Sequence, residues 1–298
     1  MAPSPKSGLR ADTHPETALR HIAAGCHADL LKYRAAVLKS AQPNGIHQTR
    51  VALRRLRAAF GLFRDAIDGP AVRSLAAEAR WLARECGPAR DLQVFLTETV
   101  TDVPPVVRRV GRRLADIHLQ HARAALSGAR FAAFDRALQA FAAKSPAASP
   151  ATPSADNRLD AFGRTVLDAR LAKALRRGRK LEQFDADRLH RLRIAIKKLR
   201  YAASFLAPAF ASTTFASMRV KPYIEATVRL QGALGALNDR AVAAQVLADL
   251  ATAARPTEDV ALPLKALAKQ VASGEKRRRR RLERAWADFR KAERFWRA

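Results

Sequence analysis

An eleven-residue motif occurs twice in the chain, and it constrains the fold more than any other feature of the sequence. The segment HQTRVALRRLR begins at His47, and HRLRIAIKKLR begins at His190. Both copies fit the pattern H-x-x-R-[VI]-A-[LI]-[RK]-[RK]-L-R. A second block agrees at one constant spacing, in which Leu82, Gly87, Asp91 and Val94 match Leu230, Gly235, Asp239 and Val242. We therefore predict two tandem copies of one structural unit.

Hydrophobic residues recur at intervals of three and four along most of the chain, which is the period of an amphipathic helix. Leu19, Ile22, Cys26 and Leu30 show this spacing, and strand-like alternation is nowhere sustained. The sequence therefore predicts an all-α fold. The expected helices cover about 15–40, 46–67, 71–86, 90–99, 105–127, 130–143, 157–181, 187–207, 213–235, 238–253, 258–273 and 275–293.

A small, polar, proline-rich stretch, SPAASPATPS, begins at Ser145 and is unsuited to a helix or a core. We interpret 145–156 as a linker between a first helical half at 19–144 and a second at 157–298, and we expect residues 1–18 to be flexible. The chain shows no secretory signal and no apolar run long enough for a membrane span. Two cysteines cannot provide a disulfide framework, so a cytoplasmic location is expected.

The charge of the chain indicates the class of partner. Lys and Arg number 55 against 27 Asp and Glu, a formal net charge of +28. Such an excess attracts polyanions, and nucleic acid, anionic lipid and a free phosphate polymer all fit this description. A hydrophobic content of 48% is enough for a sizeable core, which excludes global disorder.

Each copy of the motif places its basic residues on one face of a helix. At about 100° per residue, His47, Arg50, Arg54 and Arg57 fall within roughly 80° of one another, opposite Leu53, Leu56, Phe60 and Phe63. His190, Arg193, Lys197 and Arg200 repeat this arrangement, opposite Ile196, Leu199, Ala203 and Leu206. A solvated surface normally mixes acidic residues among such bases, but neither stripe contains a Glu. We therefore interpret both stripes as binding surfaces.

The other polar residues of the repeat allow two roles. Each motif histidine could cap or pack at a helix start, but its recurrence favours a ligand role, in which a bound phosphate would raise the imidazole pKa. Asp91 and Asp239 could hold a divalent cation beside phosphate, although helix N-capping is favoured for both. His118 and His121 are three residues apart but have no third ligand, so no metal site is expected.

At these motifs the sequence resembles the conserved histidine α-helical domain (CHAD) family. The segments that carry the resemblance are HQTRVALRRLRAAFGLF, RDLQVFL, LHRLRIAIKKLRYAASF, LQGALGALNDRAVA and the closing RFW. The resemblance implies two pseudo-symmetric helical bundles with a central basic groove that binds inorganic polyphosphate, for which phosphate or sulfate ions would be mimics. It also implies association with polyphosphate granules.

By match to those motifs, the resemblance assigns the polyphosphate-binding role to His47, Arg50, Arg54, Arg57, His190, Arg193, Lys197 and Arg200. Arg177, Lys180 and the basic run 276–281 match more loosely. The ExExK motif of the triphosphatase domain often fused to this family does not occur in the chain, so that activity is not carried over.

No catalytic motif stands out in the sequence. The phosphate-binding GxxxxGK[ST] loop, the HExxH motif and the GxSxG elbow do not occur. We therefore expect no enzymatic activity and no cofactor. The run of bases from Lys276 to Arg281 also fits nucleic-acid attachment, so a nucleic-acid-binding protein is the alternative. Since Leu282, Trp286 and Phe289 follow the run at helical spacing, we expect it to begin a helix that packs on the core.

Overall fold

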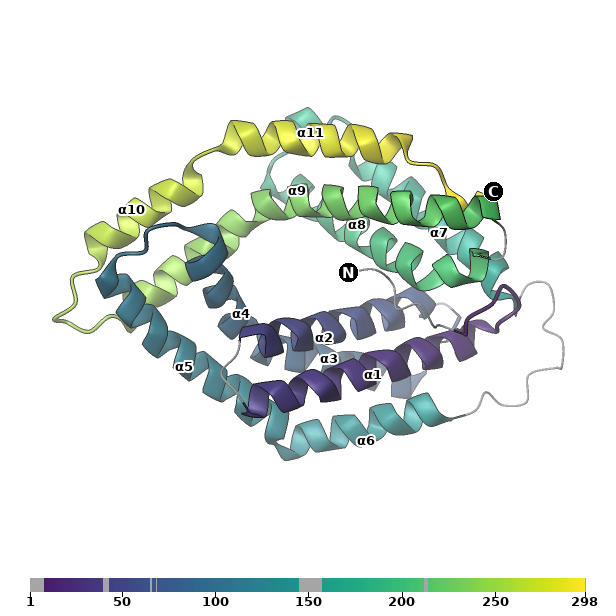
Figure 1. The fold of residues 1–298 in the computed structure, drawn as a ribbon, viewed down its shortest axis with the longest axis horizontal. Coiled ribbons are helices and arrows are strands. Elements are labelled where there is room, and N and C mark those ends of the chain that lie inside the picture. Colours follow the sequence, from purple (N-terminus) through teal and green to yellow (C-terminus); the bar gives the residue numbers. More distant parts are fainter. Residues whose placement is uncertain are drawn as a thin grey trace.

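Helices make up nearly all of the computed structural model, which describes residues 8–39, 43–64, 66–67, 69–144, 157–211 and 214–297 (Figure 1). The first half contains α1 (Pro15–Lys39), α2 (Pro43–Phe63), α3 (Pro70–Glu85), α4 (Gly87–Val94), the π-helical turn η1 (Phe95–Thr99), α5 (Pro105–Ser127) and α6 (Ala129–Ala143). The second half contains α7 (Leu159–Arg177), η3 (Leu181–Gln183), α8 (Ala186–Leu206), η4 (Ala207–Phe210), α9 (Thr214–Ala253), α10 (Ala261–Ala272), α11 (Glu275–Lys291) and η5 (Phe295–Arg297). The described residues form no β-strand, which confirms the all-α prediction.

The predicted break between helices at 213–235 and 238–253 is wrong, because α9 runs through it without interruption. In the first half the equivalent break between α3 and α4 is real, and α4 begins with Gly87 and Pro88. Proline favours the first turn of a helix, where its missing N–H is not needed. The second half has Ala236 after Gly235 at the matching place, and glycine alone does not end a helix.

The predicted flexible N-terminus is too long. Leu9 is buried, and α1 already begins at Pro15. The backbone N–H groups of Leu159 and Asp160 donate to the carbonyl oxygens of Thr13 and Ala11 at 2.9 and 3.1 Å. Residues 8–14 are therefore attached to the start of α7. The remainder of the predicted flexible segment, 1–7, and the predicted linker 145–156 lie outside the described residues.

The hydrophobic core does not divide where the sequence repeat divides. The larger core contains residues of α1, α2 and α3 together with residues of α7, α8 and α11. A smaller core joins α4 and α5 to the end of α9 and to α10. Phe63 of the first half stacks on Phe162 of the second, with ring centroids 5.1 Å apart. Each core therefore depends on both halves, so the bundles do not coincide with the halves 19–144 and 157–298.

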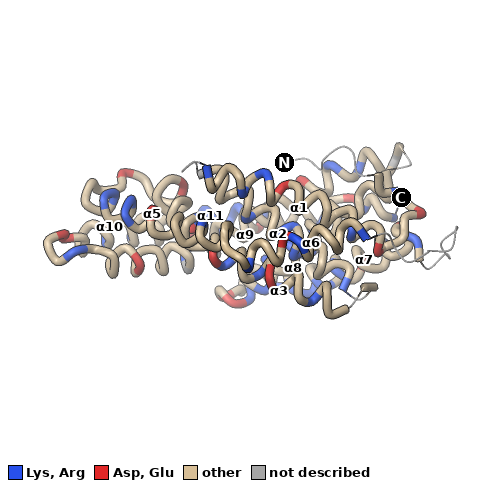
Figure 2. The backbone as a smooth tube through the Cα atoms, turned by 90° about the horizontal axis from the view of Figure 1, so that it is seen from below, with Lys and Arg blue, Asp and Glu red and all other residues tan. Residues whose placement is uncertain are grey.

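The C-terminal basic run begins a core-packing helix, as predicted. Lys276 to Arg281 form the first turns of α11, and Leu282, Trp286 and Phe289 lie buried on its other side. Among the described helices, none has the length and apolar character that crossing a membrane requires. Figure 2 shows a flat molecule with Lys and Arg along its whole length, so charge alone does not locate a site.

The packing of α11 on the end of α7 gives a stability prediction. A Cβ atom at Gly178 would lie 2.1 Å from Cη2 of Trp286, so the indole ring rests directly on the backbone there. Gly178→Ala should lower the free energy of unfolding by roughly 1–3 kcal/mol, because the buried ring must shift. The measurement is urea denaturation.

Gly25→Ala is the matched control, since a Cβ on this exposed glycine of α1 meets no atom within 4 Å. It should raise the free energy of unfolding by about 0.5–1 kcal/mol through helix propensity. Equal stability of the Gly178→Ala variant and the wild type would contradict the described position of Trp286.

Candidate polyanion-binding site

The two basic stripes of the repeat meet because α2 and α8 pack against each other. Their apolar sides hold them in place, since Leu53 and Leu56 of α2 and Ile196 and Leu199 of α8 are each at most 1% exposed. The basic residues lie on the remaining sides of the two helices. The predicted division of each helix into an apolar and a basic face is therefore confirmed.

Lys197 lies within a group of cations contributed by both helices. Its pKa is lowered to about 8, first by burial and then by the charges of Arg54, Arg193, Arg57 and Arg200. We call these five residues the shared cation cluster; its members are Arg54, Arg57, Arg193, Lys197 and Arg200. Holding them together is unfavourable without an anion, because like charges repel more strongly where water is partly excluded.

Tyr201 positions one cation of the opposite half. Its hydroxyl oxygen accepts a hydrogen bond from Nε of Arg54 at 2.8 Å, and Arg200 lies over its ring at 4.4 Å from the centroid. Arg200 in turn donates from Nε to Gln231 at 2.7 Å. Burial is the main cause of the lowered pKa of Arg200. The second half therefore orients a guanidinium group of the first.

Arg50 is held by groups of the first half. It donates to the carbonyl oxygen of Ala83 at 3.3 Å and to Asp91 at 3.4 Å. The predicted N-cap role of Asp91 is wrong, because Asp91 is the fifth residue of α4. The same prediction is wrong for Asp239, which lies inside α9, where no helix starts. Asp91 instead supplies a carboxylate to the basic stripe of α2.

The two motif histidines have different surroundings. His47 is half-buried, and its pKa is lowered by burial, then by Arg90 and Arg54. The imidazole is therefore mainly neutral at pH 7, and one ring nitrogen can donate a hydrogen bond. His190 is exposed near the start of α8. A bound anion would oppose the field of the arginines around His47 and raise its pKa.

Arg193 has a buried Nε that finds no hydrogen-bond partner among the described residues. A buried donor without an acceptor is unfavourable, and protein structures rarely retain one. An anion in the shared cation cluster would reach this buried donor only if the Arg193 side chain turned. Arg193 is therefore the member of the cluster that has an unsatisfied donor.

Three arginines that the sequence analysis did not single out extend the site. Burial and the charges of Arg80, Arg50 and Arg84 lower the pKa of Arg57, and Arg90 acts on His47. Arg80 and Arg84 belong to α3, which packs on α2. The repeat could not reveal them, because Val228, Gly232 and Asn238 stand at the places of the second half that correspond to Arg80, Arg84 and Arg90.

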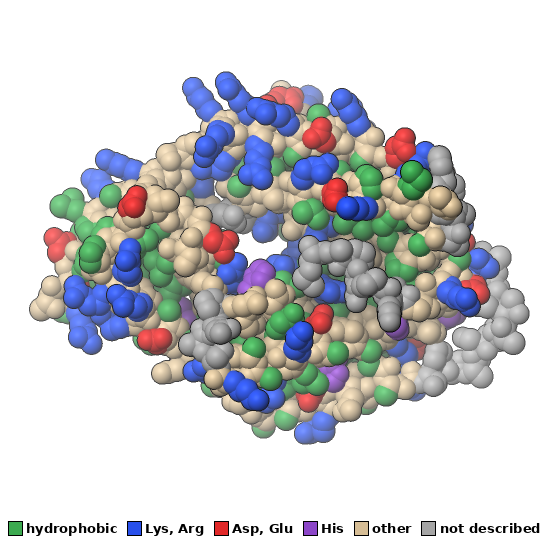
Figure 3. Space-filling view, viewed as in Figure 1, with side chains coloured by type: hydrophobic (Ala, Val, Ile, Leu, Met, Phe, Trp, Pro, Cys, Tyr) green, Lys and Arg blue, Asp and Glu red, His purple; other side chains and the backbone are tan. Residues whose placement is uncertain are grey.

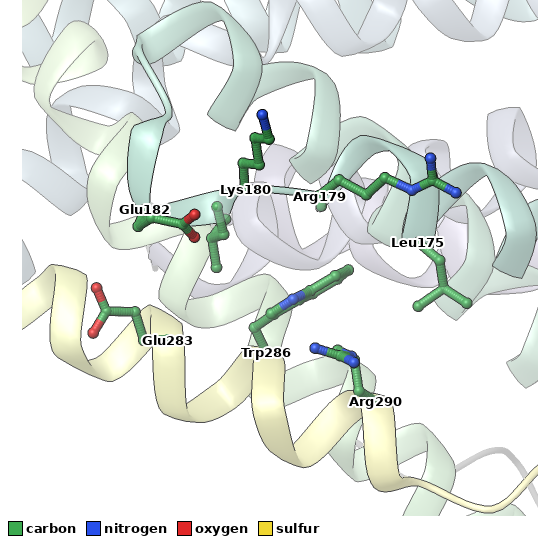
Figure 4. A pocket seen from close by; sticks show the side chains of 9 residues that line it. Leu175, Arg179, Lys180, Glu182, Glu283, Trp286 and Arg290 are labelled. Atoms are coloured by element: carbon green, nitrogen blue, oxygen red, sulfur yellow. The ribbon is translucent and has the colours of Figure 1, made fainter.

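The looser matches lie elsewhere. Arg177 donates to the carbonyl oxygen of Arg191 at 2.8 Å and contributes to the lowered pKa of Lys198, the neighbour of Lys197 on another side of α8. Lys180 has a left-handed backbone, φ 57°, and lines a pocket in which its side chain points away from the ring of Trp286 (Figure 4). Neither residue is brought into the shared cation cluster.

The molecule is hollowed near its centre. Figure 3 shows Lys, Arg and His side chains within this hollow, and in the same view of Figure 1 α2 lies below it and α9 above it. Guanidinium groups offer forked pairs of N–H donors, which suit the paired oxygens of phosphate. Among the described residues, no three His, Cys, Asp or Glu side chains gather as a metal site would require.

Comparisons with known proteins agree with the repeated motif. The family model described as CHAD domain matches residues 21–248. The crystal structure of the CHAD domain from the plant Ricinus communis is similar at a TM-score of 0.78 and 24% identity, covering 98% of this chain and 97% of that one. PptA from Streptomyces chartreusis is similar at a TM-score of 0.61 and 15% identity, covering 94% and 99%. No curated protein matches the sequence. The two structures show a shared fold.

Repulsion within the shared cation cluster gives a stability prediction with a definite pH dependence. Lys197→Met should raise the free energy of unfolding at pH 7 and low salt by about 0.5–2 kcal/mol, because it removes a half-buried charge from among four arginines. Urea denaturation measures the effect. Lys265→Met, on the exposed side of α10, is the control and should change stability by less than about 0.5 kcal/mol.

The increase in the free energy of unfolding that Lys197→Met produces should become smaller at high pH. Below about 8, Lys197 is protonated in both the folded and the unfolded chain, so the full repulsion is present. Between about 8 and the ordinary value of 10.5 the unfolded chain holds a proton that the folded chain has lost, so wild-type stability rises with pH. A Lys197→Met variant less stable than the wild type at pH 7 would show that the lysine has a structural role.

Proposed function

The chain belongs to the CHAD domain family, and on that premise we propose that it binds inorganic polyphosphate in the central hollow, through the basic residues of α2 and α8. The observation that carries the proposal is the shared cation cluster, in which burial and the charges of arginines from both helices lower the pKa of Lys197. A polymer with a negative charge on every unit would relieve this repulsion at several places at once.

The basic residues of the site would make different kinds of contact with polyphosphate. Arg54, Arg57, Arg193 and Arg200 would donate forked, charge-assisted hydrogen bonds to non-bridging oxygens, and Lys197 would act as a point charge. His47 and His190, near the N-terminal ends of α2 and α8, would donate hydrogen bonds from ring nitrogens to phosphate oxygens. Arg50, already bonded to Asp91, would contribute mainly through its charge.

The proposal includes no reaction, since binding alone accounts for the basic residues of the site. We also propose a cytoplasmic role at polyphosphate granules, in line with the family resemblance. Nucleic acid is the competing ligand. Proteins that bind single strands expose aromatic rings on which bases stack, whereas Phe60, Phe63 and Trp286 are at most 9% exposed here.

A pair of substitutions on one helix tests the site. Arg193→Gln with Lys197→Gln should weaken polyphosphate binding at least about tenfold at ~150 mM salt, because two charge-assisted contacts are lost. Arg191→Gln with Lys198→Gln removes the same charge from exposed positions of α8 and should change the affinity less than about threefold. Calorimetric titration measures the affinity, and circular dichroism checks that helicity is unchanged.

The variant with Arg191→Gln and Lys198→Gln also tests whether polyphosphate binds instead on the surface formed by α7 and α8. Lys198 lies in the field of Lys173 and Arg177. A larger loss from the Arg191 and Lys198 pair would contradict the proposed site and move it to the surface formed by α7 and α8.

Selectivity for polyphosphate over DNA is a separate expectation. We propose that the hollow bordered by α2 and α9 admits a thin flexible chain but not a stiff duplex, whereas an open basic face would accept both. Polyphosphate should therefore bind more tightly than duplex DNA at equal phosphate concentration in ~150 mM salt. Competition titration decides the point, and equal or tighter DNA binding would favour a nucleic-acid-binding function.

A further inference from the structure

The basic run at the start of α11 contains two kinds of arginine. Arg278 donates to the carbonyl oxygens of Val271 and Ala272 at 3.1 and 3.4 Å, and Arg279 pairs with Glu275 at 3.2 Å. These two residues attach α11 to its surroundings. The other kind has no such role. Its members are Arg277, Arg280, Arg281 and Arg284, which we call the outer face of α11.

The outer face points away from the core. At about 100° per residue its four arginines lie opposite Leu282, Trp286 and Phe289, which are buried. All four arginines are exposed, and Lys and Arg side chains project outward along α11 in Figure 3. They lie within about 10 Å along the helix axis, since each residue advances 1.5 Å.

The arginines of this face form no ion pair in the part of the chain that the structure describes. Some exposed arginines elsewhere have acidic partners, as Arg130 has Glu78 and Arg297 has Asp168. Asp288 lies one turn beyond Arg284 on the same side of α11, but no described residue forms an ion pair with any of the four arginines. Four neighbouring cations on one helix face repel one another, so a polyanion is the partner that this face fits.

We propose that the outer face of α11 is a second contact for long polyphosphate chains that leave the central hollow. This inference rests on the proposed function. α11 packs on α9, which borders the hollow, so about two helix layers, roughly 20 Å, separate the two sites. A chain held at the centre presents its free part to the outer face at high effective concentration, whereas a short oligomer cannot reach both sites.

Long polyphosphate fits this face better than nucleic acid does. The aromatic residues of α11, Trp286 and Phe289, are buried and offer no ring for base stacking. The apolar side of the helix is likewise in the core, so the face recognises its partner by charge alone. A flexible chain of phosphates satisfies that requirement and can be continuous with the ligand of the central hollow.

The test uses the intact chain with Arg277→Gln, Arg280→Gln and Arg284→Gln combined. The probes are tripolyphosphate and polyphosphate of about 100 units, titrated at several salt concentrations. For the long chain we expect at least a tenfold loss of affinity at ~150 mM salt and a salt dependence shallower by about 2 in log–log slope, given three charges at about 0.7 each. Tripolyphosphate binding should stay within about twofold of the wild type.

The matched control combines Lys32→Gln, Lys39→Gln and Arg136→Gln. These exposed residues of α1 and α6 lie on the opposite side of the molecule from α11, and their loss changes the net charge equally. The control should leave binding of both probes within about twofold of the wild type. A control loss equal to that of the α11 variant would overturn the proposal by showing a general charge effect.

The remaining outcomes are distinguishable. Unchanged long-chain binding, or equal losses for the short and the long probe, would overturn the second contact and leave the proposed function intact. A variant that lost only duplex DNA binding would assign the face to nucleic acid and overturn the proposal as well. Wild-type protein that bound neither polyphosphate probe would remove the proposed function, and the second contact with it.

Discussion

The apolar packing of α2 on α8, which opposes the repulsion between the cations at their junction, is the interaction on which the site depends. Burial, and then the charges of Arg54 and Arg57 of α2 and of Arg193 and Arg200 of α8, lower the pKa of Lys197. Charges about 4 Å apart repel by roughly 1–4 kcal/mol at effective dielectric constants between those of water and the protein surface. Burying one Leu, Ile or Phe side chain contributes about 1.5–3 kcal/mol, and each helix buries several. Burial of the apolar faces therefore holds α2 and α8 together against the repulsion between their basic faces.

The sequence could predict those features of this arrangement that depend on a single helix. The period of three and four, read along 47–63 and 189–206, separates Leu53 and Leu199 from Arg54 and Lys197 correctly. The family resemblance adds that the two stripes belong to one site. The continuous helix α9 was missed because the break between α3 and α4 depends on Pro88, which has no counterpart beside Gly235.

The contacts that the sequence could not predict are tertiary. Tyr201 is apolar enough to look like one more core residue, and only the packing of α8 on α2 brings its hydroxyl to Arg54. Arg80 and Arg84 lie on α3 without an equivalent in the second half, so neither periodicity nor repetition distinguishes them from surface arginines. The run that begins α11 reads as one block of charge, although its members separate into anchored and outward-facing arginines when the helix packs.

Because the two halves share a core, the arrangement of the two basic stripes is set before a ligand binds. If each half had its own core, the two stripes could move relative to each other, and binding would first have to bring them together. Instead Phe63 stacks on Phe162 and Tyr201 holds Arg54, so the distance between the stripes is fixed before any ligand arrives. A site assembled in advance loses little conformational freedom on binding. The same core that opposes the repulsion of the cations therefore also fixes the arrangement of the two stripes.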